Sequence, residues 1–217
     1  MLSISFSAPR DKHFTVLCLG AHSDDIEIGC GGTILRLLEE RPAVRAYWVV
    51  FSSNATRRRE ALRSAHLFLK NAKSKRVIVQ SYKDGFFPYQ GQKIKREFER
   101  LKKQIDPDVI FTHYRHDLHQ DHRLLNELTW NTFRGHLILE YEIPKYDGDL
   151  GSPNFFSQLD ETVCRMKVDY LQRAFASQRK RHWFNGELFF ALMRLRGMEA
   201  HSPTRFAEGF YVRKLCL

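Results

Sequence analysis

Short apolar runs alternate with amphipathic segments along this chain of 217 residues, and the alternation predicts an α/β fold. Each expected strand leads through a turn into an expected helix, which is the pattern of parallel strands joined by right-handed crossovers. A chain of this length can enclose one sizeable core. We therefore expect residues 1–217 to form a single domain, with a Rossmann-like, mostly parallel sheet and helices on both faces.

Strands are expected where β-branched and aromatic residues form short apolar runs. In chain order, these runs are Thr15–Gly20, Val44–Phe51, Arg76–Gln80, Asp108–His113 and His136–Ile143. Helices are expected where apolar residues recur at helical spacing among charged ones. These segments are residues 34–40, Thr56–Lys70, Lys93–Gln104, Arg123–Phe133, Asp160–Ser177 and Gly186–Arg196.

The last third of the chain departs from simple alternation. The segment Pro144–Phe156 is rich in Pro, Gly, Asp and aromatic residues, and it predicts a long functional loop. A final apolar run, Ala207–Leu215, is expected as a strand at the edge of the sheet.

The formal net charge of +10 favours an anionic partner, such as a phosphorylated or acidic sugar, a nucleic acid or a membrane surface. The first 14 residues lack the apolar core of a signal peptide, and no apolar run approaches the ~20 residues of a membrane span. The cysteines are widely spaced, which favours reduced thiols: Cys18, Cys30, Cys164 and Cys216. We expect a cytoplasmic protein, with peripheral membrane contact still open.

The motif Ala21-His22-Ser23-Asp24-Asp25 follows the first expected strand, at the end of the sheet where α/β proteins bind ligands. His22 and Asp25 are suitable ligands for one Zn²⁺, and Asp24 would then be free to act as a base toward metal-bound water. Behind them, Gly31 and Gly32 are expected to let the backbone turn tightly and the helix pack closely. The alternative is an ordinary helix start with an Asp N-cap and solvated charges.

A second motif, His119-Gln120-Asp121-His122, follows the fourth expected strand. In a common doubly wound order the first and fourth strands are neighbours, so the two motifs would meet in one crevice. His122 would then complete a three-ligand site with an open position. Asp121 is expected to hydrogen-bond His119 and keep it cationic, ready to stabilise an oxyanion or to protonate a leaving amine. The alternative is a helix start with Asp121 as its N-cap.

Other polar residues near the expected strand ends are candidates for supporting or binding roles. We expect His113 and His116 to be solvated or to support the ligands, although either could replace one of them. Candidates for substrate binding follow the second and fifth strands: Arg57, Glu60, Glu142, Tyr146 and Asp147. Carboxylates and tyrosines suit sugar hydroxyls, and the alternatives are a solvated basic helix and a self-packed surface loop.

The two motifs resemble those of the LmbE-like, or PIG-L-type, zinc N-deacetylases, whose patterns are A-H-P-D-D-E and H-x-D-H. The resemblance covers most of the chain, including Gly29-Cys30-Gly31-Gly32-Thr33 and the closing Ala207–Phe210. The resemblance implies that His22, Asp25 and His122 are the zinc ligands and that Asp24 is the base. It also implies that His119, together with Asp121, stabilises the oxyanion. Ser23 and Ile26 depart from the family's Pro and Glu, which affects the turn and the substrate fit rather than the chemistry.

The resemblance implies a hydrolase that removes an acetyl group from an N-acetylated amino sugar, such as an N-acetylglucosamine-containing substrate, with one zinc ion. Iron(II) also suits two histidines and a carboxylate. Two alternatives stay open: the same metal hydrolase acting on another acyl-amide, and a non-catalytic protein that binds an anionic glycan or nucleic acid. Nucleic acid is disfavoured because the basic residues are dispersed and no recognised binding motif is present. The sequence predicts no oligomeric state.

Overall fold

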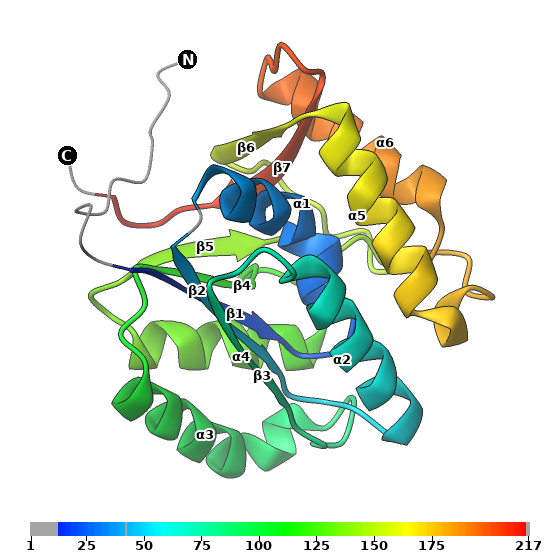
Figure 1. The fold of residues 1–217 in the computed structure, drawn as a ribbon. Coiled ribbons are helices and arrows are strands. Elements are labelled where there is room, and N and C mark those ends of the chain that lie inside the picture. The colour runs from blue at the N-terminus through cyan, green and yellow to red at the C-terminus, as the bar shows by residue number, and fades with distance from the viewer. Residues whose placement is uncertain (1–12, 42, 216–217) are drawn as a thin grey trace.

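A computed structural model describes residues 13–41 and 43–215, which contain one sheet of seven strands (Figure 1). Cys216 and residues 1–12 lie outside this part. The strands are β1 (Phe14–Gly20), β2 (Val44–Val50), β3 (Ser74–Val79), β4 (Val109–His113), β5 (Leu137–Tyr141), β6 (Phe155–Leu159) and β7 (Phe206–Tyr211). Their order across the sheet is β3-β2-β1-β4-β5-β7-β6. The first five in this order are parallel, and β7 runs antiparallel to both of its neighbours.

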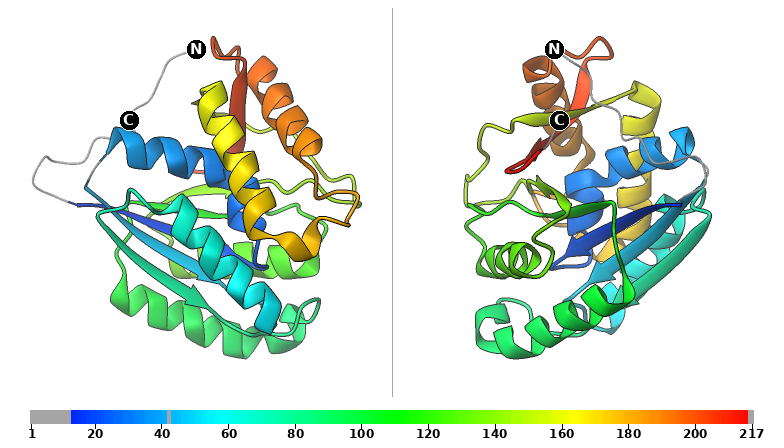
Figure 2. Two further views of the ribbon diagram at one scale, coloured as in Figure 1. Left: turned by 45° about the vertical axis from the view of Figure 1, so that its right-hand side comes forward. Right: turned by 90° about the vertical axis from the view of Figure 1, so that its left-hand side faces the viewer.

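Helices cover both faces of the sheet (Figures 1 and 2). The described α-helices are α1 (Asp25–Glu40), α2 (Ala55–Phe68), α3 (Gly91–Gln104), α4 (Gln120–Thr132), α5 (Glu161–Ala174) and α6 (Gly186–Glu199). The core of one face includes α1, α2 and α5, and the core of the other includes α3 and α4. The predicted α/β class, with a mostly parallel sheet, is therefore confirmed.

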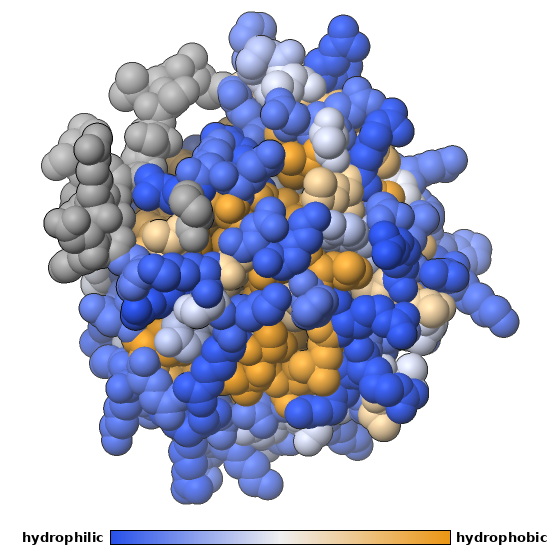
Figure 3. Space-filling model, viewed as in Figure 1, coloured by the Kyte–Doolittle hydropathy of each residue, from blue (hydrophilic) through white to orange (hydrophobic). Residues whose placement is uncertain are grey.

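The helices expose polar sides to solvent. The face drawn in Figure 3, which carries α1, α2 and α5, is mostly hydrophilic. Within the part of the chain that the structure describes, no helix has both the length and the apolar character needed to cross a membrane.

The far end of the sheet corrects the sequence prediction. The closing strand β7 is internal, and the edge strand is β6, which the sequence predicts partly as loop. β6 carries Ser157 and Gln158 and is mostly half-buried, so it lacks the apolar run that identifies a strand. β7 is buried over most of its length because β5 and β6 pair with its two edges.

Helix α1 begins at Asp25, earlier than expected, so Gly31 and Gly32 lie inside a helix and make no turn. The expected close packing is present. A Cβ atom at Gly31 would lie 2.6 Å from the ring of Phe68, and one at Gly32 would lie 2.6 Å from Leu159. A larger residue at either position would therefore push α1 away from its neighbours.

Lys167 of α5 and Glu208 of β7 form a buried ion pair against the middle of α1, with Nζ and Oε1 2.6 Å apart. Glu208 accepts hydrogen bonds from the backbone N–H groups of Gly32 (2.8 Å) and Thr33 (2.7 Å), and Lys167 donates to the carbonyl of Ile28 (2.6 Å). Side chains inserted among helix backbone groups bend a helix, and α1 changes direction along its length in Figure 2. The pair thus joins the C-terminal part of the chain to α1.

We expect Glu208→Ala to lower the free energy of unfolding by about 3–5 kcal/mol, because it leaves the Lys167 ammonium buried without its counter-charge. Denaturant unfolding measures this change. Glu161→Ala is the matched control, since Glu161 pairs with Arg165 on the surface of α5 and its loss should cost about 1 kcal/mol or less. Equal losses in the two variants would contradict the structural role of the buried pair.

Candidate metal centre and active site

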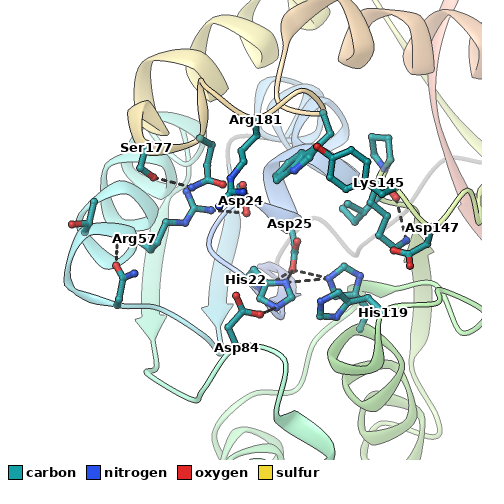
Figure 4. A pocket seen from close by; sticks show the side chains of 18 residues that line it. His22, Asp24, Asp25, Arg57, Asp84, His119, Lys145, Asp147, Ser177 and Arg181 are labelled. Atoms are coloured by element: carbon teal, nitrogen blue, oxygen red, sulfur yellow. Dashed lines mark hydrogen bonds and ion pairs between the residues drawn. The ribbon is translucent and has the colours of Figure 1, made fainter.

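The two sequence motifs meet at the carboxyl ends of β1 and β4, which are neighbours in the sheet as predicted. His22 lies in the turn after β1, and Asp25 is the first residue of α1. His119 is the residue before α4, and His122 lies in its first turn. Figure 4 shows His22, Asp25 and His119 around one pocket. Residues about a hundred positions apart are thus brought together by the strand order.

Three atoms of this group form a compact triangle. His22 Nδ1 lies 3.1 Å from His122 Nε2 and 3.3 Å from Asp25 Oδ2, and the latter two atoms are 3.6 Å apart. Ligand atoms around a tetrahedral zinc, with bonds of about 2.0–2.2 Å, are separated by about 3.4 Å. The spacing of the triangle therefore fits three donor atoms of one tetrahedral ion.

Carboxylates support the two histidines from behind. Asp117 lies 2.9 Å from His122 Nδ1, on the ring nitrogen opposite the triangle. His22 Nε2 lies 3.0 Å from Asp84 and 3.3 Å from Asp121. A carboxylate on the outer nitrogen fixes the tautomer and the orientation of a metal-binding imidazole. Both histidines are therefore held with the inner nitrogen available to a metal.

The charges around the triangle also suit a cation. Burial alone would raise the pKa of Asp25, but His122, His22 and His113 hold it well below its usual range. Burial and the nearby His113 lower the pKa of His122 to about 3, so its imidazole is neutral at neutral pH. Burial opposes a charge on His22, yet Asp25, Asp121 and Asp84 raise its pKa well above the usual value. A metal ion would replace the proton that these carboxylates stabilise.

Asp24 stands beside the triangle and is buried. Its Oδ1 forms an ion pair with the Arg57 guanidinium, at an N–O distance of 2.7 Å. Its Oδ2 has no hydrogen-bond partner among the described residues. Burial raises the pKa of Asp24, and Arg57 opposes that rise. Although Asp24 occupies the N-cap position of α1, its side chain makes no capping hydrogen bond. The alternative of an ordinary helix start therefore does not account for this carboxylate.

The expected pairing of Asp121 with His119 is wrong. The Asp121 carboxylate accepts hydrogen bonds from the backbone N–H groups of Gly85 (2.7 Å) and Phe87 (3.0 Å) and faces His22. His119 Nδ1 instead accepts from the backbone N–H of Asp121 at 3.2 Å. Burial and the nearby His22 lower the pKa of His119 despite the adjacent carboxylates. A neutral His119 therefore carries its proton on Nε2.

His113 is not solvated. It is fully buried, and its Nε2 lies 3.0 Å from the backbone nitrogen of Ala21 and 3.2 Å from Asp25 Oδ2. Its Nε2 accepts the hydrogen bond from the Ala21 N–H, and Asp25, His113 and His122 also have potential ligand atoms within 4.8 Å of one another. His116 is exposed and packs edge-on against Tyr114, outside the pocket.

The pocket beside the triangle has a volume of about 540 Å³, within the range of small-molecule sites. Of the residues predicted to bind substrate, Arg57, Tyr146 and Asp147 line it. Glu60 lies behind Arg57, and its carboxylate forms an ion pair with the Arg57 guanidinium at an N–O distance of 2.9 Å. Glu142 was misplaced by the sequence analysis: it is buried and forms a two-pronged ion pair with Arg196, at 2.6 and 2.8 Å.

Sequence reasoning missed several residues at the site: Asp84, Asp117, Lys145, Ser177, Arg181 and Trp183. One signal was available for Asp84, because Asp84-Gly85 follows β3 and therefore lies at the same end of the sheet. No local pattern marks Arg181 or Trp183. They reach the pocket from the segment between α5 and α6, which a strand-end rule does not cover.

A family model described as PIG-L, GlcNAc-PI de-N-acetylase, matches residues 17–133, which is more than half of the chain. The chain belongs to the PIG-L family. This match contains both motifs and every member of the triangle. A similar curated protein is YaiS of Escherichia coli (strain K12), named an uncharacterized deacetylase. It is 29% identical over 183 residues, which are 80% of this chain and 97% of YaiS.

Solved structures share the fold of this PIG-L family chain. N,N'-diacetylchitobiose deacetylase from Pyrococcus horikoshii superposes with a TM-score of 0.72 at 21% identity, covering 92% of this chain and 83% of that one. GalB, the 4-carboxy-2-hydroxymuconate hydratase from Pseudomonas putida KT2440, superposes with a TM-score of 0.67 at 17% identity. This match covers 94% of this chain and 98% of the GalB chain. Because one is a deacetylase and the other a hydratase, the reaction must be argued from the site.

We expect Asp117→Asn to weaken metal binding about ten- to a hundredfold, since Asp117 orients His122 from its outer nitrogen. Competition with a chelating dye, with Zn²⁺ as the metal, measures the affinity. Asp106→Asn is the matched control, because Asp106 pairs with His136 at the same kind of distance, 3.0 Å, on the surface. An unchanged affinity in Asp117→Asn would contradict the role of Asp117 in orienting His122 for a metal.

A pH-dependent stability is expected from Glu27, a buried residue of α1 whose carboxyl oxygens have no hydrogen-bond partner among the described residues. Burial raises its pKa from 4.5 to about 8. Between these values the folded chain keeps a proton that the unfolded chain releases, so the free energy of unfolding falls as pH rises, by up to about 1.4 kcal/mol per pH unit. Above about pH 8 the contribution of Glu27 to this decline should end.

Unfolding measured in a chelating buffer between pH 5 and 9 checks this expectation. Glu27→Gln mimics the protonated carboxyl and should reduce the decline to the part that His22 and Asp24, whose pKa values are also raised, contribute, whereas Glu39→Gln, at an exposed position of the same helix, should leave it in place. A decline of equal size in wild type and Glu27→Gln would mean that another group releases the proton.

Proposed function

We propose that residues 1–217 form one zinc-dependent deacetylase domain that hydrolyses the acetyl-amide bond of an N-acetylated amino sugar, such as an N-acetylglucosamine-containing compound. One observation carries the proposal: the donor triangle of His22, Asp25 and His122 stands beside a buried carboxylate, Asp24, that has an oxygen without a partner. A metal site and a base in contact with one pocket are what hydrolysis of an amide requires.

His22, Asp25 and His122 would hold the ion, and two histidines with one carboxylate suit zinc and also iron(II). When bound, the ion supplies a Lewis acid and lowers the pKa of water. The protein's own contribution is the geometry. Carboxylates behind each histidine keep the donor atoms in place, and the low pKa of Asp25 keeps this ligand ionised.

Asp24 is the proposed base. Its Oδ2 accepts a proton from the attacking water, while Arg57 holds Oδ1 and so fixes the direction of the carboxylate. The same proton is then delivered to the nitrogen of the departing amine, which gives acetate and a free amino sugar. Burial favours this exchange because it raises the pKa of Asp24 toward that of a group that both takes and returns protons.

His119 acts on the carbonyl oxygen in this scheme. Its Nδ1 accepts the backbone N–H of Asp121, so its Nε2 carries the hydrogen that it donates to the developing oxyanion. A ring nitrogen of His119 lies within 4.8 Å of nitrogens of His22 and His122. This neutral donor replaces the cationic acid that the sequence predicted, and it leaves the protonation of the amine to Asp24.

The choice of an amino sugar rests on the family and on the polar and aromatic walls of the pocket, with Tyr146 and Trp183 among them. The same centre acting on another acyl-amide is the alternative. Three described cysteines, Cys18, Cys30 and Cys164, are buried free thiols, which supports a reducing, cytoplasmic setting for the enzyme.

We expect Asp24→Asn to retain bound metal but to lower kcat about a hundred- to ten-thousandfold, since it removes the base without touching a ligand. Release of acetate from a panel of N-acetylated sugars measures turnover, and elemental analysis measures the metal. Asp169→Asn, which alters an exposed ion pair of α5, is the control. Turnover at the wild-type rate in Asp24→Asn would contradict its role, and acetate release only from non-sugar amides would favour the alternative substrate class.

A further inference from the structure

One of the carboxylates behind the triangle differs from the others, because it is shared with a lysine. Asp117 Oδ2 lies 2.9 Å from His122 Nδ1 and also 2.9 Å from Lys145 Nζ. Among the described residues, the two carboxylates behind His22 form ion pairs with that histidine alone. A carboxylate can therefore support a histidine of this site without a cation, and the presence of Lys145 needs its own explanation.

The ammonium of Lys145 is held by a second carboxylate. Its Nζ lies 2.5 Å from Asp149, whose carboxylate also accepts the backbone N–H of Leu118 at 2.7 Å. The side chains of Lys145 and Asp149 are 12% and 5% exposed, so water screens their charges little. In Figure 4 Lys145 lies on the wall of the pocket opposite Arg57. The lysine is thus fixed at the site, with its charge divided between Asp117 and Asp149.

Asp117 contacts both histidines of the second motif. Its Oδ1 accepts the backbone N–H of His119 at 2.8 Å, while its Oδ2 faces His122 Nδ1 and Lys145. A carboxylate on the outer nitrogen of an imidazole raises the basicity of the inner nitrogen and so strengthens metal binding. A cation on the same oxygen opposes this effect, because it attracts the charge that would otherwise act on the imidazole N–H.

We propose that Lys145 is a positioning residue that acts through Asp117 and limits how strongly His122 binds a metal ion. The consequence for catalysis rests on the proposed function. An ion that receives less charge from its ligands is a stronger Lewis acid toward an amide. Lys145 therefore keeps the metal less tightly bound, and more electrophilic, than Asp117 alone would.

The competing role for Lys145 is that of a loop anchor. Residues 144–149 carry Tyr146 and Asp147, which line the pocket, and Lys145 ties this loop to the turn before α4. The two roles predict opposite changes in metal affinity. Loss of an anchor would let Asp117 move and weaken metal binding, whereas loss of a tuning cation leaves the carboxylate wholly to the imidazole and strengthens it.

Two substitutions separate these roles, because each breaks the contact between Lys145 and Asp149. In Lys145→Met the affinity for Zn²⁺ should rise about tenfold, since Asp117 is no longer shared. In Asp149→Asn the amide oxygen can still accept the Leu118 N–H, but the charge of Lys145 acts on Asp117 alone. The affinity should then fall about threefold or more. Competition with a chelating dye measures both values, and a fall in both variants overturns the proposal.

A double variant covers the case in which Lys145→Met does not fold, because that change leaves two buried carboxylates without their shared cation. Lys145→Met/Asp149→Asn removes one charge of each sign and so keeps the net charge. Asp117 again supports His122 without a cation, and the affinity for Zn²⁺ should exceed that of wild type about tenfold. An affinity equal to or below that of wild type in the double variant overturns the proposal.

Two further variants serve as controls. Lys145→Arg keeps a cation on Asp117 and should bind Zn²⁺ within about threefold of wild type. Lys95→Met removes a positive charge from the surface of α3, where Lys95 pairs with Glu99 at 2.6 Å, and it should leave the affinity unchanged. A rise in Lys95→Met as large as that in Lys145→Met would assign the effect to net charge and overturn the proposal.

Turnover gives a second readout. In Lys145→Met kcat for acetate release should fall about tenfold while metal affinity rises, whereas a structural defect would lower both. Because zinc affinity is measured without turnover, failure of the two proposals is distinguishable. Raised affinity in the double variant, without acetate release by wild type, would support the role of Lys145 and contradict the deacetylase. Acetate release by wild type, with lowered affinity in both lysine-to-methionine variants at position 145, would support the deacetylase and overturn the role of Lys145.

Discussion

The buried carboxylate of Asp25 is the point on which the site depends. It begins α1, accepts the backbone N–H of His22 at 2.6 Å, and faces ring nitrogens of His22, His113 and His122. A buried charge is tolerated only where it is compensated, and the groups that do so here are the His22 N–H, the His22 imidazole with its raised pKa and the N-terminus of α1. The three histidines come from the β1–α1 turn, β4 and α4, so packing around one carboxylate fixes these three segments relative to α1.

The position of Asp25 depends in turn on how α1 is held from its other side. Lys167 and Glu208 contact the backbone of α1 one to two turns beyond Asp25, and Glu208 comes from the internal strand β7. The C-terminal part of the chain, which lies beyond the family match, thus supports the helix that carries a proposed ligand. Gly32 permits this contact, because a Cβ atom at this position would lie 3.0 Å from Glu208 Oε1.

The sequence was sufficient where a local pattern combines with a rule of topology. The strands before His22 and His119 are recognisable as apolar runs, and the order of a doubly wound sheet places them side by side. The sequence was insufficient where the hydrogen-bond or ion-pair partner of a side chain lies far away in the sequence. Asp121 turns to the amides of Gly85 and Phe87, more than thirty residues earlier, and Glu142 turns to Arg196. No spacing encodes such choices, since they follow from how α4, α6 and the loops pack.

The base and the outer wall of the pocket are also connected through one chain of polar contacts. Arg57 holds Asp24, Glu60 holds Arg57, and Glu60 accepts both hydrogen bonds from Ser177, which begins the turn that carries Arg181. Glu60 therefore fixes two parts of the pocket at once: the turn after α5 and the Arg57 guanidinium that pairs with Asp24. A ligand that shifts this turn would act on Ser177 and, through Glu60 and Arg57, on the orientation of the Asp24 carboxylate. Asp24, the proposed base, and the turn after α5 are thus joined by one set of polar contacts, although they come from segments more than a hundred residues apart.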